Sequence, residues 1–140
     1  MLQSLLWMAL QIASASAISP ELLSDPRVLS FCRVLATNAI ADRSREHGAF
    51  VVRTSDDVLY FVVWPPSGER DMLRWSGRFP DGTIAILHTH EAYVPHASKL
   101  DMRAARSARV PVYVITRNTI TKTTGAPSEV VMGAEWMKKK

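Results

Sequence analysis

The chain contains a single cysteine, Cys32, among its 140 residues. One thiol excludes an internal disulfide and also a cysteine-rich zinc site. Glycine (6) and proline (8) are too few for a collagen-like or low-complexity chain, and a net charge of +4 is too small for a disordered one. Any metal site in this chain would therefore use histidine and carboxylate ligands.

Several catalytic signatures are missing as well. The sequence contains neither G-x-x-x-x-G-K-[ST] nor G-x-G-x-x-G, so nothing in it supports nucleotide binding. His90-Glu91 does not open an H-E-x-x-H zincin motif, because Val94 stands where the second histidine belongs. A zinc deaminase needs paired cysteines, whereas this chain has one. A cupin-like or facial-triad iron site expects a β-barrel with no helix between its ligands, whereas a helix is predicted here over Ser98–Arg109.

Positive charge is concentrated at the C-terminus. The basic tail Lys138–Lys140 supplies three of the four net charges, which leaves +1 for the rest of the chain. Arg103, Arg106 and Arg109 recur at every third residue and could share a helix face that binds an anion, but we favour a role in solubility. We therefore expect no nucleic-acid partner.

The length predicts one domain over residues 18–137, large enough to bury a core without staples. Residues 1–17 predict either an N-terminal helix or an export signal peptide. We favour the helix, and with it a cytoplasmic location, because no lysine or arginine precedes Arg27. The segment is too short and too polar for a transmembrane span.

Hydrophobic spacing predicts two further helices. Asp25 can cap the first of them and Pro26 suits its first turn, after which apolar residues repeat at helical spacing to about Ile40. Cys32 falls on this apolar face, so we expect a core residue and not a reactive thiol. The second helix is predicted over Ser98–Arg109.

The remaining apolar runs predict strands. Ala49–Arg53 and Val58–Trp64 flank a turn-rich quartet and predict a hairpin, whereas Glu69–Phe79 is predicted to be a loop. Further strands are predicted at Thr83–Leu87, Val110–Thr116, Thr119–Thr123 and Glu129–Met132. The sequence therefore predicts one α+β domain with a mixed or largely antiparallel sheet flanked by helices.

Two histidines stand at the end of the strand predicted at Thr83–Leu87. Side chains alternate along a strand, so His88 and His90 should point to the same side. Asp101 follows in the first turn of the next helix, and a strand-loop-helix return can bring its carboxylate back over the strand end. Two histidines and one aspartate leave a fourth position open, as in catalytic zinc sites.

Ser98 and Asp101 also have a purely structural interpretation. Ser98-x-x-Asp101 before an alanine-rich stretch is typical of a capping box at a helix N-terminus. The two interpretations are compatible, because a ligand in the first turn of a helix is well oriented.

The pattern H-x-H-x7-S-x2-D, formed by His88, His90, Ser98 and Asp101, resembles the signature of the JAMM (MPN+/JAB) metalloproteases. The resemblance covers about residues 46–116, half of the chain. It implies a JAMM/MPN-like domain with one Zn²⁺ per chain, held by His88, His90 and Asp101, with water at the fourth position. Ser98 would donate a hydrogen bond to the oxyanion, and the reaction would be the hydrolysis of a peptide or isopeptide bond in a peptide or protein, including ubiquitin-like substrates.

The same resemblance implies an upstream glutamate as general base. Glu46 matches best, because it precedes Gly48 and an apolar strand, although its spacing to the glycine is one residue shorter than in some members. The rivals are Glu69 and Asp71, or a Glu46 that is only a polar helix terminus.

One residue departs from the family pattern. Glu91 follows the second histidine where the family usually has proline, which predicts a looser turn or compensation by Pro95. The alternative function is a catalytically inactive JAMM-like fold that serves as a protein-binding or assembly module. Retention of both histidines, the serine and the aspartate favours the hydrolase.

Three further expectations concern the surroundings of the site. Residues 65–81 are the candidate insertion for substrate contacts, with Trp64, Trp75 and Phe79 as apolar groups. His47 and His96 are expected to lie outside the metal site.

Overall fold

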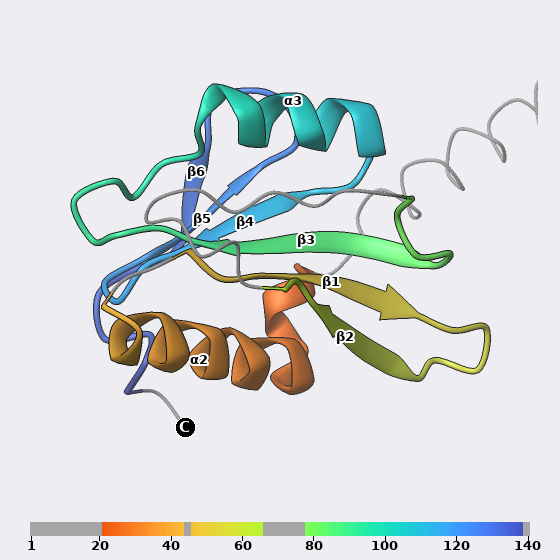
Figure 1. Cartoon of the computed structure of the whole chain (residues 1–140), viewed down its shortest axis with the longest axis horizontal. Coiled ribbons are helices and arrows are strands. Elements are labelled where there is room, and N and C mark those ends of the chain that lie inside the picture. The colour runs from red at the N-terminus through yellow and green to blue at the C-terminus, as the bar shows by residue number, and fades with distance from the viewer. Residues whose placement is uncertain (1–20, 44–45, 66–77, 139–140) are drawn as a thin grey trace, which may run out of the picture.

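Six strands form one mixed sheet in the order β2-β1-β3-β4-β5-β6 (Figure 1). The computed structural model of the chain describes residues 21–43, 46–65 and 78–138. Its strands are β1 (Gly48–Arg53), β2 (Leu59–Val63), β3 (Thr83–Thr89), β4 (Val112–Ile115), β5 (Ile120–Thr123) and β6 (Glu129–Met132). Strands β3 and β4 pair in parallel, and the other neighbouring pairs are antiparallel. The predicted α+β class with a mixed sheet is confirmed.

Helix α2 (Pro26–Ala41) covers one face of this sheet, together with the short 3-10 helix η1 (Leu22–Ser24). Asp25 caps α2, because its carboxylate accepts a hydrogen bond from the Arg27 N–H at 2.9 Å. The prediction that Pro26 begins the helix is confirmed. Cys32 is fully buried, as expected, and burial raises the pKa of its thiol to about 12.

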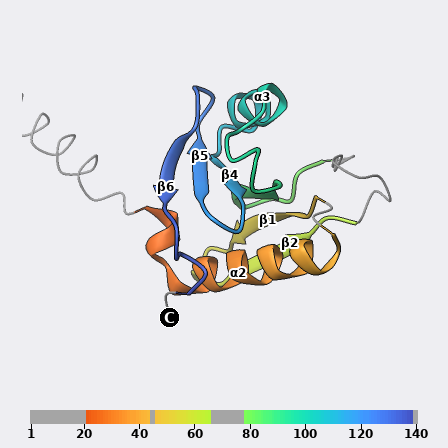
Figure 2. The same ribbon diagram turned by 90° about the vertical axis from the view of Figure 1, so that its left-hand side faces the viewer.

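Helix α3 (Lys99–Ala108) lies on the opposite face of the sheet (Figure 2). It forms the crossover between β3 and β4, since two parallel strands cannot be joined by a tight turn. Ala105 is buried there against Phe50, Ile86 and Val112. Because α3 runs back along the sheet, its N-terminus lies at the C-terminal end of β3.

Within the described residues the predicted helices and strands occur, with shifted ends. Strand β3 continues to Thr89, two residues beyond the prediction, because the Thr89 N–H donates to the His47 carbonyl at 2.8 Å and Thr89 pairs with Ile115 of β4. His88 is therefore a strand residue, and His90 is the first residue after the strand.

Some predictions lie outside the described residues. These are the N-terminal helix or export signal over residues 1–17 and most of the loop and insertion, with Glu69, Asp71 and Trp75. In the ranges that the structure describes, no helix is both long and apolar enough to span a bilayer.

Trp136 is a core residue that the sequence analysis did not single out. It is fully buried although it follows the last strand, and its indole N–H donates to the Thr116 carbonyl at 2.9 Å. The C-terminal turn thereby closes the core on the α2 face of the sheet.

Removal of this anchor should destabilise the whole domain. We expect Trp136→Ala to lower the free energy of unfolding by about 3–5 kcal/mol, since a large buried side chain is deleted. Trp136→Phe should lower the free energy of unfolding by less, because it keeps a buried aromatic ring although it loses the hydrogen bond to Thr116. Urea unfolding followed by circular dichroism measures both, and a loss below about 1 kcal/mol for Trp136→Ala would contradict the assignment.

Candidate metal centre

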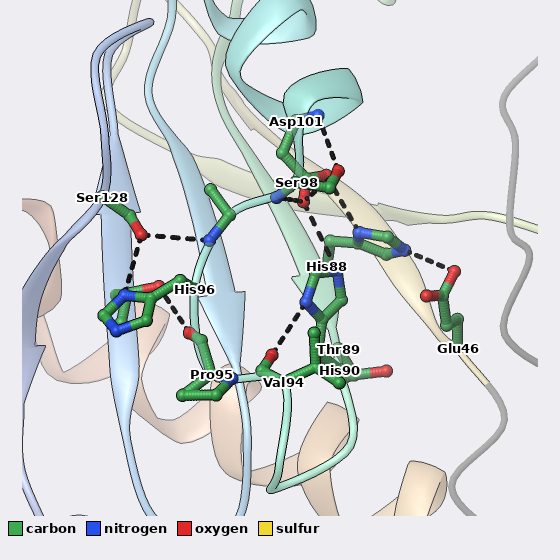
Figure 3. A network of polar contacts seen from close by, with 12 residues as sticks. Glu46, His88, Thr89, His90, Val94, Pro95, His96, Ser98, Asp101 and Ser128 are labelled. Atoms are coloured by element: carbon green, nitrogen blue, oxygen red, sulfur yellow. Dashed lines mark hydrogen bonds and ion pairs between the residues drawn. The ribbon is translucent and has the colours of Figure 1, made fainter.

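His88 and His90 stand at the C-terminal end of β3, and both side chains project toward the N-terminus of α3 (Figure 3). Their rings meet edge-on with centroids 4.9 Å apart. Main-chain pairing fixes both positions: His88 lies between Gly48 of β1 and Val114 of β4, and the His90 N–H donates to the Ile115 carbonyl at 2.9 Å. The structure thus brings the two imidazoles together as strand alternation predicts.

Asp101 reaches the same point from the first turn of α3. One carboxylate oxygen lies 3.2 Å from Nδ1 of His88, and the other lies 3.4 Å from Nε2 of His90. All three side chains are about nine-tenths buried or more. The crossover geometry of β3, α3 and β4 therefore accounts for the convergence of residues 88, 90 and 101.

Glu46 completes the cluster from the segment before β1. Its Oε2 lies 3.0 Å from Nε2 of His88, and its side chain is 15% exposed. The neighbouring residue His47 exchanges two hydrogen bonds with Thr89, one from the His47 N–H to the threonine hydroxyl and one from the Thr89 N–H to the His47 carbonyl. These bonds hold Glu46 beside the end of β3.

The charges of the cluster determine the protonation of His88. Burial alone would lower the pKa of this imidazole, but hydrogen bonds and negative charge from Asp101 and Glu46 outweigh burial and raise the pKa to about 9. Burial would raise the pKa of Asp101, yet its contacts with the two histidines hold that pKa well below the usual range. The carboxylates of Asp101 and Glu46 therefore flank one imidazole, whose raised pKa places a positive charge between them.

The hydrogen bonds of His90 determine which of its ring nitrogens faces Asp101. Its Nδ1 lies 3.1 Å from the Val94 carbonyl, which can only accept, so Nδ1 carries the hydrogen. In a neutral ring the Nε2 atom then has a lone pair, and this lone pair faces a carboxylate oxygen of Asp101. Two acceptors in contact need a shared proton or a cation.

The donor set fits a zinc ion. Imidazole nitrogens and carboxylate oxygens are zinc ligands, and one such atom from each of Glu46, His88 and His90 lies within 4.8 Å of the others. This group contains Glu46, whereas the sequence predicts Asp101 as the third ligand beside His88 and His90. Asp101 lies outside this group, because it contacts Nδ1 of His88 whereas Glu46 contacts Nε2 of the same ring.

Ser98 forms the predicted capping box with Asp101. The serine hydroxyl accepts from the Asp101 N–H at 3.1 Å and donates to the Asp101 carboxylate at 2.9 Å, which also accepts from the Ser98 N–H at 2.8 Å. The hydroxyl hydrogen is thus directed at Asp101. Ser98 positions the aspartate in this structure, and a role as oxyanion donor would require its hydroxyl to turn.

Hydrogen bonds hold the loop after His90, in which Glu91 stands where the JAMM pattern has proline. The Thr121 hydroxyl donates to the Pro95 carbonyl at 2.9 Å, and the Ala97 N–H donates to the Ser128 hydroxyl at 3.0 Å. These contacts were not foreseen, because main-chain carbonyls leave no trace in a sequence motif and because Thr121 and Ser128 are distant from the loop in sequence.

The remaining histidines and aromatic residues surround the site. His47 contacts Asp42 at 3.3 Å, and His96 contacts Ser128 at 3.2 Å. Neither histidine belongs to the metal-ligand group found among the described residues. Trp64 and Phe79 both pack against Phe50, and the Trp64 ring centroid lies 6.0 Å from that of His88.

Substitution of Ser98 tests its positioning role. We expect Ser98→Ala to lower stability by about 1 kcal/mol, since the α3 cap is lost. Ser98→Thr keeps the hydroxyl and should recover most of this loss. Thermal unfolding of the two variants measures the difference, and equal stability of Ser98→Ala and the parent would show that the cap contributes nothing.

Comparison of the chain with protein-family models, curated proteins and solved structures finds no match. The resemblance to JAMM metalloproteases is carried by Glu46, His88, His90, Ser98 and Asp101 themselves.

Proposed function

We propose that this protein is a zinc-dependent hydrolase that cleaves an amide bond, in the manner of a JAMM-type peptidase or isopeptidase. The observation that carries the proposal is the convergence of Glu46, His88, His90 and Asp101 from three separate segments. Buried carboxylates that face imidazole nitrogens are a costly arrangement unless a cation or proton is shared between them.

In this proposal the cluster residues act as metal ligands and as a general base. His88, His90 and Asp101 would hold Zn²⁺, which supplies Lewis acidity to polarise the substrate carbonyl and to acidify a water molecule. Glu46 lies on the β1 side of His88, opposite the contact with Asp101. Its carboxylate would take a proton from the attacking water and return it to the amine nitrogen as the C–N bond breaks. The water oxygen remains on the acyl carbon.

A second candidate is a binding module without turnover. Protonated His88 between Asp101 and Glu46 already compensates the buried carboxylates, so the cluster can persist as an ion-pair network. In that case the protein would use its surface to bind a partner and would hydrolyse nothing.

Metal content distinguishes the zinc hydrolase from the binding module without turnover. We expect about one zinc per chain in wild-type protein purified without chelator, and none in His88→Ala/His90→Ala. His96→Ala is the matched control and should keep its zinc, because His96 contacts Ser128 instead of the cluster. Elemental analysis of protein shown to be folded measures this, and a metal-free wild type after incubation with zinc would refute the hydrolase.

Two isosteric variants assign the carboxylates. If Asp101 is the ligand and Glu46 the base, Asp101→Asn should lose zinc, while Glu46→Gln should keep it and hydrolyse about 10²–10⁴-fold more slowly. Zinc titration and turnover on a pool of quenched fluorescent peptides and a ubiquitin-like conjugate give both readouts. Zinc loss from Glu46→Gln alone would reverse the assignment and make Glu46 the ligand.

A further inference from the structure

A cavity of about 240 Å³ lies on the face of the sheet that α2 covers, next to His90 of the proposed metal site. It is bounded by the C-terminal half of α2, the ends of β3 and β4, and the loop after β3, which meet at one end of the molecule (Figure 1). His90 lines the cavity and also contacts Asp101 in the proposed metal site. His90 is thus the residue that connects the cavity, on the α2 face of the sheet, with the cluster at the N-terminus of α3.

One wall of the cavity is apolar. Ala36 and Ala39 of α2 are buried and face Ile115 at the end of β4, so small side chains leave the space open. The volume is below the roughly 300–1,000 Å³ of pockets that hold drug-sized ligands. It suits a single aliphatic side chain.

Arg117 is one of the residues that line the cavity. Arg117 follows β4 and is exposed, and no acidic side chain within residues 21–43, 46–65 and 78–138 forms an ion pair with it. Arg27 and Arg53, in contrast, are paired with aspartates. Glu91, which also lines the cavity, interacts within the chain. An arginine beside an apolar wall is suited to a carboxylate that adjoins an aliphatic side chain.

We propose that the cavity binds the aliphatic side chain of a substrate's C-terminal residue while Arg117 binds its free carboxylate. This rests on the proposed function, because the amide that precedes the C-terminal residue would be hydrolysed at the proposed zinc site. Water would add its oxygen to the acyl carbon, the C–N bond would break, and the leaving nitrogen would gain a proton. The product would be a free aliphatic amino acid, released from a peptide or from a protein tail.

Binding of a small probe tests the cavity without any need for catalysis. The probe is N-acetyl-L-leucine, and its controls are N-acetyl-L-leucinamide, which lacks the carboxylate, and N-acetylglycine, which lacks the side chain. Titration of the full chain followed by amide NMR should shift the signals of Ala39 and Arg117. We expect both controls to bind at least about tenfold more weakly, with or without zinc.

Two variants with matched controls locate the binding. Ala39→Leu should fill the cavity and abolish binding, whereas Ala41→Leu, at an exposed position of the same helix, should not. Arg117→Gln should equalise the affinities for the acid and the amide, whereas Arg103→Gln on exposed α3 should not. Arg117 is exposed, so its variant remains informative even if Ala39→Leu fails to fold.

The outcomes distinguish the two proposals. Unchanged discrimination in Arg117→Gln, or no binding of N-acetyl-L-leucine to the wild type, would overturn the assignment of the cavity whatever the zinc content. Specific binding by a protein that holds no zinc and cleaves no peptide would keep the carboxylate site and refute the hydrolase. Preferential release of C-terminal leucine over leucinamide by the zinc-loaded wild type, lost in Arg117→Gln, would support both.

Discussion

The parallel pairing of β3 with β4 is the constraint on which the site depends. Two adjacent parallel strands require a crossover, and here the crossover is α3, which begins over the end of β3. A capped first turn with Asp101 is thereby brought against His88 and His90. The antiparallel pairing of β1 on the other side of β3 supplies Glu46. Main-chain pairing thus places His88, His90 and Glu46, and the capped crossover helix places Asp101.

Burial of the carboxylates of the cluster has an electrostatic free-energy cost, which a bound cation or a protonated imidazole offsets. A carboxylate with little exposure is destabilised by the loss of water, and Asp101 is compensated by contacts with both imidazoles and by the capping hydrogen bonds. Sites of this kind are typical of function more than of stability, since apolar residues of similar volume would pack there at lower cost. The cavity beside His90 has the opposite character, with alanines that leave space unfilled.

Local signals accounted for most of the fold. Asp25-Pro26 predicted the start of α2, strand alternation predicted the shared side of His88 and His90, and the capping box predicted the start of α3. Tertiary packing accounts for what was missed. The burial of Trp136 and the cavity lined by Arg117 depend on segments that are distant in sequence. The choice between Glu46 and Asp101 as a ligand depends on angstrom-scale placement that no spacing rule contains.

His90 is held entirely by main-chain atoms outside the cluster: its N–H donates to the Ile115 carbonyl and its ring donates to the Val94 carbonyl. Side chains of the intervening loop take no part in these bonds. Exchange of the side chains at residues 91–93 would therefore remove neither of these two acceptor carbonyls. The same three residues border the cavity. This makes the loop a natural place to engineer altered ligand preference independently of the chemistry at the cluster.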